Sequence, residues 1–218
     1  NHQRAARFHH HFPRPFRLVA AVAVLWAITG WVGAVAASPL APEAPAEDRD
    51  ALLDRYFLQI RDLPFKWRDV GSVLEAIAFV QFRAAHADTR REVIPGAAYF
   101  DNEGRTLGEI DLIVFDNNEE RVEEVYEIKL TGSPGNAGQR ANRQLARLRR
   151  ALAEGRVVRF LSPPGFRQLE PRHFAGEPQY GRIGSWETRG RGWAHTLDLR
   201  REEGDTLQAR ILAYLNRE

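Results

Sequence analysis

Two apolar segments of this chain carry charged residues where an interior β-strand would normally bury aliphatic side chains. Residues 108–113 read Gly-Glu-Ile-Asp-Leu-Ile, and residues 126–129 read Tyr-Glu-Ile-Lys. An isolated charge is costly to bury unless a partner or a metal ion compensates it. Because side chains alternate along a strand, Glu127 and Lys129 should share one face, and a short connection would bring Asp111 beside them. The sequence therefore predicts a compensated charge cluster within a β-sheet.

Apolar spacing and turn residues divide the rest of the chain into helices and strands. We expect helices over 49–63, over 71–87 and from the loop 132–135 to about Glu154, with Gly155 as its cap, and strands over 91–100 (kinked at Pro95-Gly96), 108–115, 121–130 and 157–161. The order helix, three strands, helix, strand indicates an α/β (α+β) fold with a mixed central sheet flanked by helices. Beyond residue 162 we expect an irregular extension with short strands and a closing helix over 205–216.

The first 37 residues are expected to be a targeting segment. Residues 18–37 contain no charged residue and follow four arginines, and small residues at 34–37 suit cleavage of a signal peptide. The same stretch is long enough for an uncleaved membrane anchor. Either interpretation predicts an exported chain, periplasmic, secreted or tethered facing outside, with residues 38–48 as a linker. A buried core helix, or a wrongly chosen start site upstream of a cytoplasmic protein, is the alternative.

Two residue types restrict the chemistry that this chain can support. Cysteine is absent, which excludes disulfides and thiolate metal sites, so oxygen or imidazole would have to hold any metal ion. Lysine occurs only at Lys66 and Lys129, against 29 arginines. Once the four arginines of residues 1–37 are set aside, acidic residues outnumber basic ones, so the overall charge does not indicate nucleic-acid binding.

The charges predicted to cluster suit metal-assisted hydrolysis of a phosphodiester. A divalent cation shields the phosphate and lowers the pKa of the attacking water. Mg²⁺ prefers oxygen ligands and keeps several waters, so Asp111, Glu127 and the carbonyl of Ile128 would be enough to hold Mg²⁺ or Mn²⁺. Lys129 would position the water or stabilise the phosphorus centre. The alternative is an ordinary ion pair between Glu127 and Lys129 on a solvated face of the sheet.

These motifs, in this order of elements, resemble the PD-(D/E)XK nuclease superfamily. Within it, the Gly-Glu-Ile-Asp and Glu-Ile-Lys segments are most similar to archaeal Holliday-junction resolvases and related bacterial proteins. The resemblance covers residues 71–163 as the core of a domain spanning 49–218, and Ile110 replaces the proline of the family name. It implies that Asp111, Glu127 and Lys129 form the metal site and activate water.

The resemblance also implies two supporting residues, each with a structural alternative. A glutamate on the first helix of the family corresponds to Glu75, and a glutamine on the helix after the third strand corresponds to Gln144, with Gln139 a weaker match. However, the segment from Ser72 to Glu75 also reads as a capping box, in which Glu75 would only satisfy the start of a helix. Gln144 could equally be an exposed helix residue.

Arginines concentrate on the helix beside the predicted site. Residues 140–159 contain seven arginines and one acidic residue. We expect Arg140, Arg143 and Arg147 to contact the phosphate backbone of a nucleic acid. The alternative is a solvated helix in a chain that is rich in arginine throughout.

Two hypotheses from different classes follow from the sequence. The first is a Mg²⁺-dependent endonuclease acting on nucleic acid, in particular DNA, with a homodimer as one possible assembly. The second is a nuclease-like module that binds nucleic acid or a protein partner without turnover. A membrane-tethered structural domain is a third possibility, and no motif in residues 164–218 indicates chemistry.

Overall fold

The computed structural model describes residues 48–87 and 90–217, which contain four α-helices and six β-strands. The helices are α1 (Arg49–Ile60), α2 (Gly71–Ala85), α3 (Pro134–Ala153) and α4 (Arg201–Leu215). The strands are β1 (Arg91–Phe100), β2 (Thr106–Asp116), β3 (Arg121–Lys129), β4 (Arg159–Leu161), β5 (Gln179–Gly184) and β6 (His195–Thr196). The described residues therefore form a mixed α/β domain.

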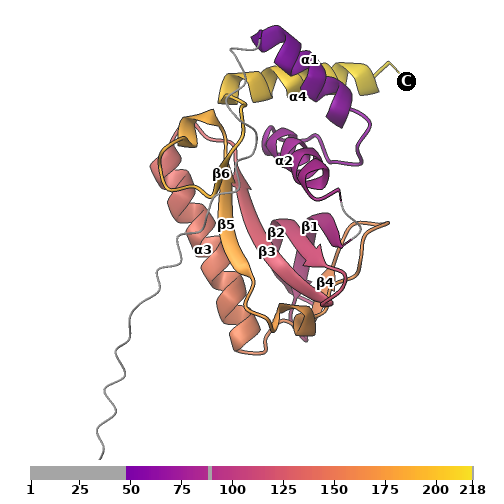
Figure 1. The fold of residues 1–218 in the computed structure, drawn as a ribbon, viewed down its shortest axis with the longest axis vertical. Helices are drawn as coiled ribbons and strands as arrows, with labels where there is room; N and C mark the ends of the chain where they lie inside the picture. The colour runs from indigo at the N-terminus through magenta and orange to yellow at the C-terminus, as the bar shows by residue number, and fades with distance from the viewer. Residues whose placement is uncertain (1–47, 88–89, 218) are drawn as a thin grey trace, which may run out of the picture. The chain divides into compact units, whose positions relative to one another are not determined.

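All six strands belong to one mixed sheet in the order β4-β1-β2-β3-β5-β6 (Figure 1). From β4 to β3, neighbouring strands run antiparallel, whereas β3, β5 and β6 run parallel to one another. The strand β3 thus lies at the boundary between the two halves, with β2 on one side and β5 on the other. The charged residues of β3 therefore lie between the antiparallel and the parallel half of the sheet.

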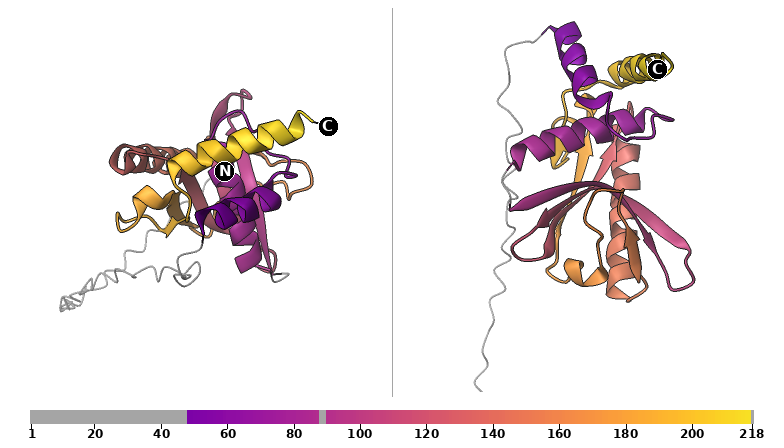
Figure 2. Two further views of the ribbon diagram at one scale, coloured as in Figure 1. Left: turned by 90° about the horizontal axis from the view of Figure 1, so that it is seen from above. Right: turned by 90° about the vertical axis from the view of Figure 1, so that its right-hand side faces the viewer.

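Helices cover both faces of the sheet. The helix α3 packs against β2, β3 and β5 on one face, while α2 contacts β1, β2 and β3 on the other. Figure 2 shows α1 and α4 on the outer side of α2, and these three helices contact one another. Two apolar cores result, one between the sheet and the α1-α2-α4 layer and one under α3.

The strand β1 changes face at Gly96, which has φ 72, a conformation that glycine adopts without steric cost. The side chains of Ile94 and Ala97 both belong to the core under α3, although strict alternation would place them on opposite faces. Alternation also fails in the neighbouring strand β2, since Ile110 and Ile113 both belong to that core. The predicted kink at Pro95-Gly96 therefore coincides with a real irregularity next to Asp111, and simple alternation is wrong across it.

The expected elements between residues 49 and 154 agree with the structure to within a few residues. Gly155, with φ 63, follows the end of α3 as predicted. The expected fourth strand is shorter, and it pairs with β1 at the far edge of the sheet. The parallel neighbour of β3 is instead β5, from the region taken as an irregular extension, so that description was wrong for residues 179–184. The last helix also begins four residues earlier than expected.

The predicted signal or anchor segment and most of the predicted linker, residues 1–47, lie outside the described residues. Within 48–87 and 90–217, no helix is both long and apolar enough to cross a bilayer. Export, anchoring and the domain boundaries remain predictions.

We expect Gly108→Ala to lower the free energy of unfolding by about 1–3 kcal/mol, because the added methyl group would overpack the core. A Cβ at Gly108 would lie 2.7 Å from Cζ of Tyr99 and closer still to its hydroxyl oxygen, and Tyr99 is 2% exposed. Urea denaturation measures the change. Gly135→Ala is the matched control, since a methyl group added there would have no atom within 4 Å apart from its chain neighbours and its own helix backbone. Equal stability of the Gly108 variant and wild type would contradict this packing.

Candidate active site

The strands β2 and β3 separate at their charged segments. Their ladder ends at the pair Leu112↔Tyr126. Just beyond it, Asp111 Oδ2 accepts a hydrogen bond from the backbone N–H of Ile128 at 2.7 Å. A carboxylate thus satisfies a main-chain donor of β3 that β2 leaves without a backbone partner. The predicted charged residues meet at this opening in the sheet.

The ammonium group of Lys129 joins two carboxylates from different strands. Its Nζ lies 2.9 Å from Glu127 Oε2 and 3.1 Å from Asp111 Oδ2. The side chains of Lys129, Asp111 and Glu127 are 22%, 13% and 2% exposed. The cluster is therefore largely buried. Salt screens buried charges much less than charges on an open surface. The structure brings these three predicted residues together, and their catalytic roles remain predictions.

Glu75 approaches the cluster from the second turn of α2. The negative charge of Asp111 and the positive charge of Lys129 both act on its carboxyl group. The capping-box alternative for Glu75 is wrong, because α2 begins at Gly71 and the Ser72 N–H donates to Asp69 Oδ1 at 3.3 Å, not to Glu75. The hydroxyl of Ser72 instead donates to the carbonyl of Lys66 at 2.8 Å. The helix start therefore does not account for Glu75.

Burial and mutual repulsion favour the protonated forms of two of these acids. Burial, followed by the charge of Asp111, raises the pKa of both Glu75 and Glu127 to about 8, and the Lys129 charge only partly opposes the shift. Burial lowers the pKa of Lys129, but Asp111 and Glu127 more than offset this, and the pKa ends above its ordinary value. The lysine therefore stays charged but does not neutralise the acids around it.

The donor set fits a hard divalent cation. Asp111 and Glu127 offer carboxyl oxygens, and one ammonium group contacts both of them. In an extended strand the N–H and C=O of one residue face the same neighbour, so the Ile128 carbonyl faces the opening that its N–H faces. Among residues 48–87 and 90–217, no group of three His, Asp or Glu side chains is placed to hold a metal ion. Mg²⁺ does not require three such side chains, because it keeps several waters as ligands.

The structure does not join the remaining predicted residues to this cluster. Gln144 is half-buried on α3, and no hydrogen bond connects it to another described residue, so its role stays a prediction. Arg140, Arg143 and Arg147 lie on the exposed side of α3, opposite its buried alanines and leucines. None of these arginines forms an ion pair with a residue that the structure describes.

Tyr99 on β1 is a neighbour of the site that sequence reasoning missed. Burial raises its pKa, the charge of Arg147 lowers it, and the charge of Glu127 raises it again. The tyrosine thus lies within electrostatic range of both the buried glutamate and the α3 arginine. The one sequence signal is Gly108, whose missing side chain leaves room for the Tyr99 ring.

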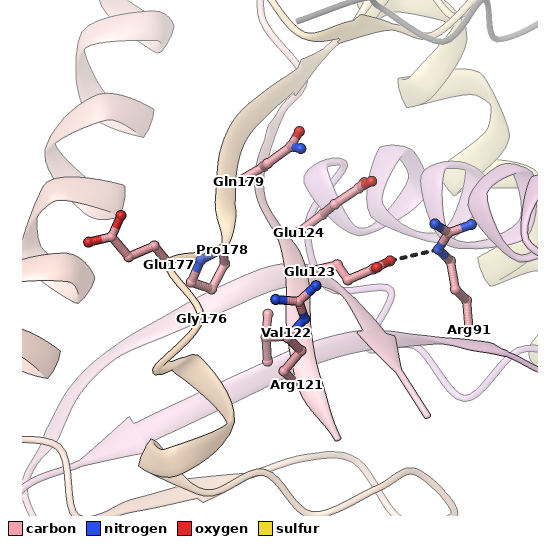
Figure 3. Close-up of a pocket in the computed structure, with 9 residues that line it drawn as sticks. All are labelled: Arg91, Arg121, Val122, Glu123, Glu124, Gly176, Glu177, Pro178 and Gln179. Carbon is pink, nitrogen blue, oxygen red and sulfur yellow. Dashed lines mark hydrogen bonds and ion pairs between the residues drawn. The ribbon is translucent and has the colours of Figure 1, made fainter. Parts of the chain in front are cut away.

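A separate hollow of about 280 Å³ lies at the opposite end of β3 (Figure 3). Its lining combines acidic and basic side chains, including the ion pair of Arg91 Nε with Glu123 Oε2 at 2.6 Å. None of the predicted site residues lines it. The hollow therefore gives no support to the proposed chemistry.

Comparison with known proteins leaves the family of this chain open. No family model matches the sequence, and no curated protein matches it either. Two solved structures are similar. NucC from P. aeruginosa ATCC27853, in its cAAA-bound form, is 17% identical with a TM-score of 0.31, over 62% of this chain and 60% of that one. NucC from E. coli MS115-1, also cAAA-bound, is 18% identical with a TM-score of 0.31, over 66% and 65%.

The matched region spans less than two thirds of either NucC chain. A likeness of this size carries no argument about activity. The functional case therefore depends on the geometry of the cluster itself.

We expect Glu127→Gln to become more stable relative to wild type as the pH rises from about 5 to about 8. The folded-state pKa of Glu127, about 8, lies above its ordinary 4.5. The folded chain thus retains a proton that the unfolded chain has released, and the stability from that proton is lost as the pH rises through the folded pKa. The difference in unfolding free energy should change by roughly 1–3 kcal/mol, measured by urea denaturation in EDTA.

Glu119→Gln is the matched control, because Glu119 is exposed in the turn between β2 and β3. Its pH profile should follow that of wild type. A difference between Glu127→Gln and wild type that stays constant with pH would contradict the raised pKa.

Proposed function

We propose that this chain is a metal-dependent phosphodiester hydrolase, an endonuclease acting on DNA. The observation that carries the proposal is the convergence of Asp111 and Glu127, from separate strands, on the Nζ of Lys129. An ion pair on a solvated sheet face would not bury Glu127 to 2% exposure. Nor would it require a second carboxylate on the same ammonium group.

In this proposal Asp111, Glu127 and the carbonyl of Ile128 hold Mg²⁺ or Mn²⁺. The bound cation would act as a Lewis acid on the phosphate and lower the pKa of a coordinated water. Lys129 would orient that water or stabilise the charge at phosphorus, with a compact ammonium group that arginine cannot reproduce. A metal ion would also oppose the burial and the repulsion by Asp111 that raise the pKa of Glu127.

Glu75 and Gln144 are proposed as supporting residues on unequal grounds. The electrostatic coupling of Glu75 to Asp111 and Lys129 supports its participation. The role of Gln144 rests on the motif resemblance alone. Membership of the PD-(D/E)XK superfamily, and the likeness to Holliday-junction resolvases, likewise rest on the sequence motifs and belong to this proposal.

DNA is the proposed partner because the exposed side of α3 is basic. Arg140, Arg143 and Arg147 have no ion-pair partner among the described residues and are free to contact phosphates. Export, or tethering through residues 18–37, remains part of the proposal. Mass spectrometry of the mature N-terminus would distinguish a cleaved signal from an anchor or a cytoplasmic chain.

We expect the full chain to cut plasmid DNA in Mg²⁺ and to lose cutting at least about 100-fold on Lys129→Ala or Asp111→Asn. Each change removes a charge that would act directly on the water, the metal or the phosphate. Nicking and linearisation on agarose gels measure the rate. Lys66→Ala is the matched control, because it changes the only other lysine, which is exposed outside the cluster.

Equal rates for wild type and Lys129→Ala would contradict the proposal. If wild type and variants are all inert yet retain DNA, the binding module without turnover is the better description. The intact set of two carboxylates and a lysine favours the hydrolase over that second function.

A further inference from the structure

The loop that follows β5 exposes two arginines between two tryptophans. Residues 186–193 read Trp-Glu-Thr-Arg-Gly-Arg-Gly-Trp, and residues 189–192 are all exposed. Gly190 and Gly192 have φ 67 and 70, so the chain turns tightly at both glycines. We call residues 186–193 the Arg-Gly loop.

The Arg-Gly loop lies beside the candidate active site. In the parallel pairing of β3 with β5, Lys129 lies opposite Gly184, so both strands end at the same edge of the sheet. Beyond this edge, the backbone N–H of Thr131 donates to the Ser185 hydroxyl oxygen at 3.3 Å. The loop begins at the next residue, Trp186. Figure 1 shows the loop beside the N-terminal end of α3.

The arginines of the loop are not used to neutralise acids. Neither Arg189 nor Arg191 forms an ion pair with a residue in 48–87 or 90–217. The one acid of the loop, Glu187, accepts hydrogen bonds from the Ser185 hydroxyl at 2.5 Å and the Arg201 backbone at 2.9 Å. The positive charge of the loop is therefore available to an anionic partner.

One arginine lies over an aromatic ring. The guanidinium carbon of Arg189 lies 3.5 Å from the centre of the Trp186 ring. At the other end of the loop, Arg182 lies 5.1 Å from the Trp193 ring and donates to the Gly192 carbonyl at 2.5 Å. Arg182 thus fixes the loop, while the outer side of Arg189 stays exposed.

We infer that the Arg-Gly loop binds unpaired nucleotides next to the scissile phosphodiester. A positively charged segment with planar stacking groups suits single strands, whose bases are free to stack on aromatic rings and guanidinium planes. Bases inside a duplex are already stacked on one another and cannot use such a surface. The inference rests on the proposed function, since it specifies the substrate of the same site as nucleic acid with a single-stranded region.

The test compares Arg189→Gln/Arg191→Gln with wild type, both as full chains, for binding to a labelled thymidine oligonucleotide and to a labelled duplex. Fluorescence anisotropy in EDTA measures binding without cleavage. We expect the double variant to lose about tenfold in affinity for the single strand and less than about threefold for the duplex. Circular dichroism confirms that both exposed substitutions leave the fold intact.

Arg156→Gln/Arg159→Gln is the matched control. It removes the same charge from exposed residues at and before β4, on the opposite edge of the sheet. Arg156 differs from the loop arginines in its exposed ion pair with Glu154 at 3.5 Å, whereas Arg159 also lies over an aromatic ring, Phe100. Single-strand affinity equal to wild type in the loop variant, or equal losses for both substrates, would overturn the inference. The binding assay contains EDTA and no metal, so a chain that never cuts DNA can still show the expected difference in binding. Failure of hydrolysis and failure of the loop inference are therefore distinguishable.

Discussion

The pairing of one ammonium group with two carboxylates across the opening between β2 and β3 determines the rest of the site. Asp111 contacts both the Ile128 N–H and Lys129, so it fixes β3 where the backbone ladder has ended. Glu127 is almost fully buried beside the same lysine. Breaking such a buried pair leaves an uncompensated charge, which is far more costly than the pair itself. The cluster therefore constrains the sheet as well as any chemistry it supports.

The architecture places basic side chains around this buried cluster. The change from antiparallel to parallel pairing at β3 puts the end of β5 and the Arg-Gly loop beside Lys129. The helix α3 contributes exposed arginines on one face of the sheet, and α2 contributes Glu75 from the other face. Acidic groups thus concentrate in the buried opening and basic groups on the surrounding surface. The proposed function would use this distribution to bind a polyanionic substrate around a cation.

Much of this arrangement is readable from local sequence, and the rest depends on long-range pairing. The three strands and α3 follow from apolar periodicity and from glycine and proline at their ends, and the cluster follows from charges within apolar segments. The position of β5 beside β3 does not follow from the local sequence, because residues 179–184 are too short and too mixed in polarity to identify a strand. The same reason hides Tyr99, whose proximity to Glu127 depends on the register of β1. Glu75 was ambiguous until the helix start at Gly71 separated it from a capping role.

The most direct test of the account is a Mn²⁺ titration of the full chain by isothermal calorimetry, with Asp111→Asn and Glu127→Gln beside wild type. Asp205→Asn, an exposed change on α4, is the control. The account predicts one ion bound per wild-type and control chain, and an affinity weaker by roughly tenfold or more in each of the two site variants. Equal Mn²⁺ affinity in all four chains would show that the two carboxylates do not share a cation, and would contradict the central claim.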